Sequence, residues 1–253
     1  MSTKKEYNIE VKIYGSRKDL GAAAAERFAR EIDRLLIEKQ EINVVFAAAP
    51  SQNEFLKYLF DQNLAWNRIN AFHMDEYIGL PANAPQGFGN FLKDRLFARF
   101  SFKSVHYLNG NAENLDEECL RYSDLLLQYP IDIVCMGIGE NGHLAFNDPP
   151  VADFEDPLTV KVVDLDLACR NQQVNDGCFK HLDEVPLSAL TLTIPTLLRA
   201  KFISSVVPGT TKARAVANTL EKEISTRYPS TILRNHTNVE LFLDYESSQL
   251  LNK

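Results

Sequence analysis

A glycine-rich segment in the middle of the chain combines residue types that can transfer protons. The apolar run 131–135 predicts a buried strand, and it leads into MGIGENGHLAFNDPP at residues 136–150. His143 supplies an imidazole, the type of side chain that can both give and take a proton, and Asp148 follows where a carboxylate could orient it. Open α/β sheets bind ligands just beyond the carboxyl ends of their strands, so this segment is the first candidate for an active site. His143 stands among glycines rather than on an apolar helix face, which favours function over a core role.

Two adjacent carboxylates follow another apolar run. Asp75 and Glu76 come directly after AFHM at residues 71–74. Neighbouring charge and partial burial can raise the pKa of a carboxyl group, which suits a general base. A solvated turn is the alternative interpretation of this pair. His73 is a minor candidate, because it precedes Asp75 on the predicted strand and would point to the same face.

A third strand end reads VVPGTTK at residues 206–212 and begins a predicted helix. Backbone N–H groups at a helix N-terminus, the hydroxyls of Thr210 and Thr211 and the ammonium group of Lys212 can together hold a phosphate. The segment is not a Walker A motif, which requires Gly, four residues and then Gly-Lys-Ser/Thr. An ordinary helix cap is the alternative.

Strands and helices alternate along the chain. Apolar runs predict strands at 9–14, 43–47, 68–74, 105–108, 131–136, 158–165, 189–194, 201–207 and 239–243. Helical periodicity and capping signals predict helices at 16–35, 50–60, 89–100, 115–128, 210–220 and 245–251. This alternation predicts an α/β fold with a mostly parallel sheet and helices on both faces. The polar, interrupted stretch at about 154–182 predicts a mobile lid over the site.

Composition favours one soluble domain spanning residues 1–253. Hydrophobic residues make up 45% and charged residues 24% of the chain, and the net charge of −7 argues against nucleic acid as the main partner. No apolar run approaches the roughly 20 residues that span a membrane, and Met1–Lys5 lacks signal-peptide character, so we expect a cytoplasmic protein. The four cysteines have no metal-ligand spacing and are expected to be reduced thiols, and no metal site is predicted.

Three strand-end motifs occur in order: MDEYIGL at 74–80, GIGENGHLAFNDP at 137–149 and PGTTKA at 208–213. Together with ALTLTI at 189–194 they resemble the glucosamine-6-phosphate deaminase/isomerase family, whose broader group contains the 6-phosphogluconolactonases. The similarity runs from about Tyr7 to Leu243. It implies a Rossmann-like, doubly wound fold, a possible homo-oligomer, and a cofactor-free conversion of an amino-sugar phosphate to a ketose phosphate and ammonia.

The resemblance also implies roles for individual residues. Asp75 is similar to the base that takes the C2 proton, and His143 to the acid/base that opens the sugar ring at O5 and O1. Asn141 and Asp148 fall where the family places partners of that histidine. Arg170 and Lys212 resemble the phosphate clamp. The substrate- and phosphate-binding residues expected on this basis are Ser51, Gln52, Glu76, Gly139, Arg170, Thr210 and Lys212.

The chain departs from the family pattern around the sugar and the phosphate. A Thr-Gly-Gly-Thr/Ser-Pro loop is typical of the family, but here residues 47–53 read AAAPSQN, which restricts the backbone. Residues 86–88 read QGF where the family usually has a Ser-Tyr pair. Asp148 is one methylene shorter than the family's usual Glu. These changes favour a divergent member with a different phosphosugar.

Two other functions compete with an amino-sugar-phosphate deaminase. A 6-phosphogluconolactonase would not abstract a C2 proton, so Asp75 would be less critical. A phosphosugar-sensing module would carry a DNA-binding helix-turn-helix before the sensor, and a first strand near Tyr7 leaves no room for one. The sequence from Ala145 to Pro149 favours the deaminase.

Overall fold

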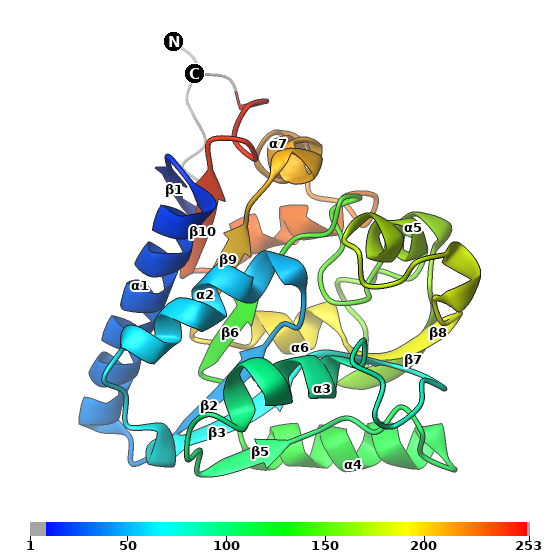
Figure 1. Cartoon of the computed structure of the whole chain (residues 1–253), viewed down its shortest axis with the longest axis horizontal. Coiled ribbons are helices and arrows are strands. Elements are labelled where there is room, and N and C mark those ends of the chain that lie inside the picture. Colours follow the sequence, from blue (N-terminus) through cyan, green and yellow to red (C-terminus); the bar gives the residue numbers. More distant parts are fainter. Residues whose placement is uncertain (1–8, 252–253) are drawn as a thin grey trace.

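The computed structural model describes residues 9–251, and its strands form two sheets (Figure 1). The sequence-based expectations for Met1–Lys5 and for Tyr7 concern residues outside this range. All strands of the large sheet are parallel. In spatial order they are β1 (Ile9–Tyr14), β10 (Val239–Asp244), β9 (Phe202–Val207), β6 (Ile133–Met136), β2 (Ile42–Phe46), β3 (Ile69–His73) and β5 (Ser104–His106).

Helices cover both faces of the large sheet, as the sequence predicts. One face packs against α1 (Arg17–Glu38), α2 (Asn53–Tyr58) and α3 (Phe88–Leu92). The opposite face packs against α4 (Leu115–Gln128), α6 (Ile194–Leu198) and α7 (Ala213–Glu221). The α/β class and the parallel sheet are therefore confirmed.

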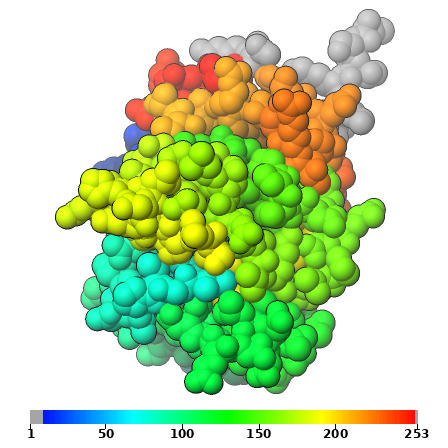
Figure 2. All heavy atoms as spheres, turned by 90° about the vertical axis from the view of Figure 1, so that its right-hand side faces the viewer, coloured from blue at the N-terminus to red at the C-terminus, as the bar shows by residue number. Residues whose placement is uncertain are grey.

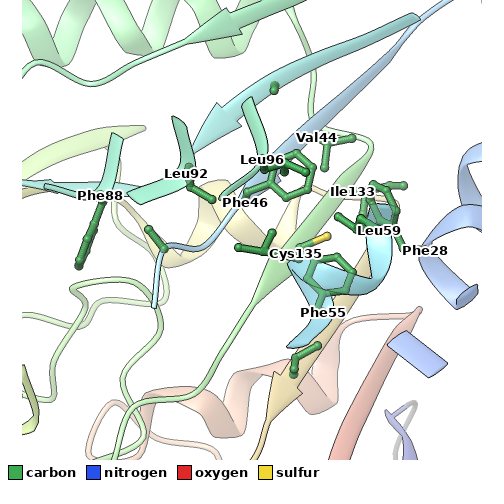
Figure 3. Packing of buried hydrophobic residues seen from close by; sticks show 14 of the residues in the cluster. Phe28, Val44, Phe46, Phe55, Leu59, Phe88, Leu92, Leu96, Ile133 and Cys135 are labelled. Atoms are coloured by element: carbon green, nitrogen blue, oxygen red, sulfur yellow. The ribbon is translucent and has the colours of Figure 1, made fainter. Parts of the chain in front are cut away.

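Alternating side chains of β2 show how two cores arise from one strand. Val44 and Phe46 belong to the core under α1 and α2, whereas Val45 belongs to the core on the other face. The Phe28 ring of α1 lies 5.9 Å from the Phe46 ring and meets the Phe55 ring of α2 edge to face at 82°; Figure 3 labels all three residues. Burying each such ring contributes roughly 1.5–3 kcal/mol, so this cluster anchors the helices that lead to the site.

A second, antiparallel sheet is the main feature that the sequence did not predict. It consists of β4 (Asp75–Tyr77), β8 (Ser188–Leu192) and β7 (Val160–Asp164). The strands predicted at 158–165 and 189–194 are confirmed as β7 and β8, but they pair antiparallel in this small sheet and take no part in the parallel one. Only Met74 separates β3 from β4, so the chain passes directly from one sheet to the other. The buried–exposed pattern of β7 fits a strand at a sheet edge with one face covered.

The stretch predicted as a lid folds into regular structure. It contains β7 and the helix α5 (Leu167–Asn175), which begins at the N-cap Asp166. In Figure 2 the yellow segment near residues 180–190 lies against the cyan segment near residues 75–90, and Phe179 packs edge to face on Tyr77 at 5.6 Å. Whether this layer moves stays a prediction.

The predicted helix at 245–251 is also wrong, because this segment forms turns. Asp244 accepts a hydrogen bond from the Ser247 N–H at 2.7 Å, and its own N–H donates to the Ser247 hydroxyl at 3.1 Å. These side-chain bonds compete with helical ones and turn the chain. The helix expected at 89–100 begins at Phe88 and continues as a π-helical turn over Lys93–Phe97.

Candidate active site

A cavity opens beyond the carboxyl ends of β2, β3, β6 and β9. Segments that follow these strands form its walls together with α5. The lining residues are Ala47, Ala48, Ala49, Ser51, Met74, Asp75, Phe88, Gly137, Ile138, Gly139, His143, Ala145, Phe146, Gln172, Gln173 and Lys212. The fold thus brings three separate sequence motifs to one cavity.

Asp75 lines this cavity as the first residue of β4, held by antiparallel pairing with Thr191 of β8. Its side chain is almost entirely buried. Burial, and secondarily the negative charge of Glu76, raises the pKa of Asp75 well above its ordinary value. A carboxylate with a raised pKa binds a proton more firmly, which makes it a stronger base.

The His143 ring packs directly on the backbone of Gly139, in a tight turn that needs glycine. The N–H of Gly139 donates to the His143 carbonyl at 3.0 Å, and the Gly142 N–H donates to the Gly139 carbonyl at 2.9 Å. Gly142 has a φ of +90°, in the left-handed region that favours glycine. A side chain at Gly139 would collide with the imidazole of His143, so only a glycine here allows the ring to line the cavity.

A second turn brings Asp148 back to His143. Ala145 adopts a left-handed φ of +51°, and the Asn147 N–H closes the turn on the Leu144 carbonyl at 3.1 Å. His143 Nδ1 then lies 3.0 Å from Asp148 Oδ1, although the contact is misaligned for a hydrogen bond. The short aspartate therefore reaches the imidazole despite its missing methylene.

Asn141 links the two residues. Its amide donates to Asp148 Oδ1 at 2.7 Å, and its Oδ1 accepts from the His143 N–H at 3.0 Å. Burial alone would raise the pKa of Asp148, but the imidazole of His143 and the amide of Asn141 outweigh it and hold that pKa below its ordinary value. Asp148 is therefore charged near neutral pH and can stabilise a protonated imidazole.

Lys212, in the strand-end motif PGTTKA at residues 208–213, provides a buried cation. It ends the 3₁₀ turn Thr210–Lys212 after β9 and lines the cavity, with 5% of its surface exposed. Burial lowers the pKa of Lys212, against the opposing charges of Asp176 and Glu140. Within residues 9–251, no ion pair holds its ammonium group, so the charge is available for an anion.

The altered loop after β2 forms without glycines. Ala47, Ala48, Ala49 and Ser51 all line the cavity, and none of them has a positive φ. Alanine adopts such a backbone as readily as glycine does, so the loss of glycine does not disable this loop. Gln52 is buried behind it and donates to the Ser51 hydroxyl at 3.1 Å and to the Val206 carbonyl at 3.2 Å.

Glu76 lies outside the cavity wall and caps a helix. Its carboxylate accepts hydrogen bonds from the N–H groups of Tyr77, Phe88 and Gly89 at 2.8–2.9 Å. Two of these N–H groups are at the start of α3, where a negative charge is stabilising. Through this contact Glu76 holds Phe88, which does line the cavity.

Arg170 and Thr210 also lie away from the cavity wall. The guanidinium of Arg170 donates to the carbonyls of Leu182 and Val185 at 2.6 and 3.0 Å. Thr210 is exposed, and its hydroxyl is 3.4 Å from the Glu246 carboxylate.

His73 is a core histidine. Its Nδ1 is 2.8 Å from the Asp75 carbonyl, and its Nε2 accepts from the Leu108 N–H at 2.9 Å. Both ring nitrogens are thus satisfied away from the cavity.

Two glutamines of α5 line the cavity although the sequence does not predict them as site residues. Gln172 and Gln173 are buried and line the cavity, and Gln172 Oε1 accepts from the Glu140 N–H at 2.8 Å. They share one helix face with Cys169, because residues three and four apart are neighbours on a helix. That spacing was visible in the sequence, but polar residues on the inner face gave no amphipathic signal.

A family model described as glucosamine-6-phosphate isomerases/6-phosphogluconolactonase matches residues 15–242. This chain belongs to that family of sugar-phosphate enzymes. It is 33% identical over 229 residues to a glucosamine-6-phosphate deaminase of Listeria monocytogenes, covering 90% of this chain and 96% of that protein. A glucosamine-6-phosphate deaminase of Bacillus cereus is 31% identical over the same length, covering 90% and 86% of the two chains.

Solved structures of family members share the fold. One, described as a monomeric glucosamine-6-phosphate deaminase, is 31% identical with a TM-score of 0.87, covering 96% of this chain and all of that one. A 6-phosphogluconolactonase of Trypanosoma brucei is 17% identical with a TM-score of 0.80, covering 98% and 100% of the chains. At 17% identity, this likeness shows a shared fold and nothing about activity. Within residues 9–251, no helix combines the length and apolarity needed to cross a membrane.

Proposed function

We propose that this chain is an isomerising deaminase of an amino-sugar 6-phosphate, with glucosamine 6-phosphate as the first candidate substrate. The observation that carries the proposal is that Asp75, His143 and Lys212 line a single cavity. The reaction needs ring opening, C2 proton transfer and phosphate binding. The imidazole of His143, paired with Asp148, suits ring opening, and the carboxylate of Asp75, whose pKa is raised, suits the C2 proton transfer. The ammonium group of Lys212, unpaired among the described residues, suits phosphate binding.

The reaction begins with ring opening at His143. The imidazolium gives a proton to O5 as the C1–O5 bond breaks, and the neutral imidazole that results takes the proton of the O1 hydroxyl, which leaves the C1 aldehyde. Asp148, held by Asn141, stabilises the charged imidazole before the transfer. A group that both donates and accepts near neutral pH is required, and imidazole meets that need.

Asp75 then moves the C2 proton. Its carboxylate takes that proton while protonated His143 returns a proton to O1, so the C1 carbonyl becomes an enol hydroxyl. Asp75 then delivers its proton to C1 as the amine-bearing C2 becomes an iminium. Water adds at C2 and ammonia leaves, which gives the ketose 6-phosphate. Each step is a proton transfer or an addition of water, so the reaction as proposed uses no cofactor.

The substrate phosphate fits between Lys212 and the loop after β2. Lys212 supplies the positive charge, and Ser51 lies on the same cavity wall. Charge-assisted bonds of this kind are about twice as strong as neutral ones. Arg170, carried over from the family pattern, engages two carbonyls instead, so Lys212 is the better-supported half of the clamp.

A panel of hexosamine 6-phosphates, assayed for ammonia and ketose phosphate, tests this function. We expect turnover of at least one member, and none of the unphosphorylated sugars at equal concentration. Hydrolysis of 6-phosphogluconolactone is scored beside it. Lactone hydrolysis without ammonia release would replace the deaminase by a lactonase, and tight binding of a phosphosugar without turnover would replace it by a sensor.

The oligomeric state stays a prediction. One solved relative is described as monomeric, whereas the family resemblance implied a possible homo-oligomer. Light scattering of the purified chain distinguishes the two, and the cavity described above is built from one chain only.

A further inference from the structure

Folding of α5 places a cysteine beside the proton-transfer pair. The ligand atoms of His143, Asp148 and Cys169 all lie within 4.8 Å of one another, and all three residues are buried. Their spacing in the sequence matches no common metal motif, so only the fold brings them together. Cys169 has no part in the reaction proposed above.

Two polar atoms of this cluster lack a hydrogen-bond partner among the described residues. They are His143 Nδ1 and Asp148 Oδ2, both shielded from solvent. Asp148 is fully buried, so an unpaired carboxylate oxygen there is costly. Lone pairs on nitrogen, oxygen and sulfur that converge in a buried space fit a cation that accepts all three.

The donor set selects the type of cation. Thiolate and imidazole favour Zn²⁺ or a similar soft ion, whereas Mg²⁺ and Ca²⁺ require oxygen ligands. With Zn–S near 2.3 Å and Zn–N or Zn–O near 2.0 Å, tetrahedral ligands stand roughly 3.5 Å apart, so small side-chain shifts would close the site. Three protein ligands leave a fourth position for water.

We propose that His143, Asp148 and Cys169 form an inhibitory Zn²⁺ site. On binding, the Cys169 thiol releases its proton to solvent and the thiolate and carboxylate charges balance the ion. Zn²⁺ occupies one ring nitrogen of His143, so the imidazole keeps only the N–H of its other nitrogen and can no longer become the imidazolium that protonates O5. Zinc binding is independent of the proposed function, and only the inhibition rests on it.

Titration of the full-length, metal-free chain with Zn²⁺ tests the site directly. We expect one Zn²⁺ per chain by calorimetry, and weakening by at least about tenfold in Cys169→Ser and Cys169→Ala. Cys178→Ser, which changes a cysteine outside the cluster, is the matched control and should bind as the wild type does. Thermal melts of the metal-free variants establish that each one folds.

Co²⁺ gives a second readout that does not depend on activity. The wild-type and Cys178→Ser proteins should show a thiolate-to-cobalt charge-transfer band that Cys169→Ser lacks. Equal Zn²⁺ affinity in Cys169→Ser, or no stoichiometric binding by the wild type, would overturn the site. Zinc binding in a protein that never releases ammonia would instead remove the proposed function and leave the site standing.

Discussion

The imidazole of His143 occupies the space where any other residue at Gly139 would place its Cβ. A Cβ built at Gly139 falls 2.2 Å from His143 Cε1, 2.3 Å from Nε2 and 2.4 Å from Nδ1. No side chain coexists with the ring at these distances. The glycine of this motif therefore sets the position of the imidazole, in addition to shaping the turn.

Gly139→Ala should displace the His143 ring and lower kcat/KM by about 10²-fold, because a shift of about 1 Å can have that effect. Steady-state kinetics measure the loss. Gly15→Ala is the control, since nothing lies within 4 Å of a Cβ at Gly15. An active Gly139→Ala enzyme would mean that the ring can function elsewhere.

Asp75→Asn should lower kcat by about 10²–10⁴-fold with little change in KM, because it removes a general base and keeps the shape of the side chain. Ammonia release from the best substrate of the panel is the measurement. Asp124→Asn, on the exposed face of α4, controls for the loss of a carboxylate. Full turnover by Asp75→Asn would eliminate this residue as the base.

The same substitution should stabilise the fold at neutral pH. The pKa of Asp75 is raised in the folded protein, so its ionisation opposes folding at any pH above the unfolded value near 3.9. Removing the charge should raise Tm, by about 2–4 °C for each kcal/mol gained. The gain should shrink as the pH falls toward about 4 and disappear below it, where Asp75 is protonated in both the folded and the unfolded states.

Asp148→Asn should change Tm at neutral pH in the opposite direction to Asp75→Asn. The pKa of Asp148 is lowered in the folded protein, so its charge stabilises folding above the unfolded pKa near 3.9. This contribution is lost as the pH falls through the lowered folded pKa. Asp148→Asn should therefore lower Tm at neutral pH, and thermal scans that move both variants in one direction would contradict these assignments.

Lys212→Met should raise KM for the phosphosugar by about 10- to 100-fold, the range for losing a charge-assisted bond. Arg170→Met tests the other predicted half of the clamp. Since its guanidinium binds the carbonyls of Leu182 and Val185, we expect a lower Tm and a nearly unchanged KM. A KM increase in Arg170→Met equal to that in Lys212→Met would place both residues on the phosphate.

Periodicity and strand-end position predicted much of this molecule. The helix face Leu20, Ala24, Phe28, Ile32 and Leu35 is buried throughout. The predicted helix Leu115–Gln128 has the observed bounds. These features depend on local sequence, where the apolar period determines which face is covered.

Local sequence did not predict which way some side chains point or which distant strands pair. Arg170 is two residues from Gln172, about 200° around the helix, so it points elsewhere although it is adjacent in sequence. The small sheet pairs Asp75 with Thr191, and no local pattern specifies a partner so distant. The position of Cys169 beside His143 and Asp148 likewise depends on contacts between residues distant in the sequence.

The single residue Met74 between β3 and β4 has a mechanical consequence. The Leu192 N–H donates to the Met74 carbonyl at 2.8 Å, and the Phe146 N–H donates to the Thr191 hydroxyl at 3.1 Å. Asp75 and the turn that carries His143 are thus both attached to β8, although they follow different strands of the large sheet. The small sheet supports both Asp75 and the His143 turn, so a shear between the two sheets would move them together and preserve the distance between them.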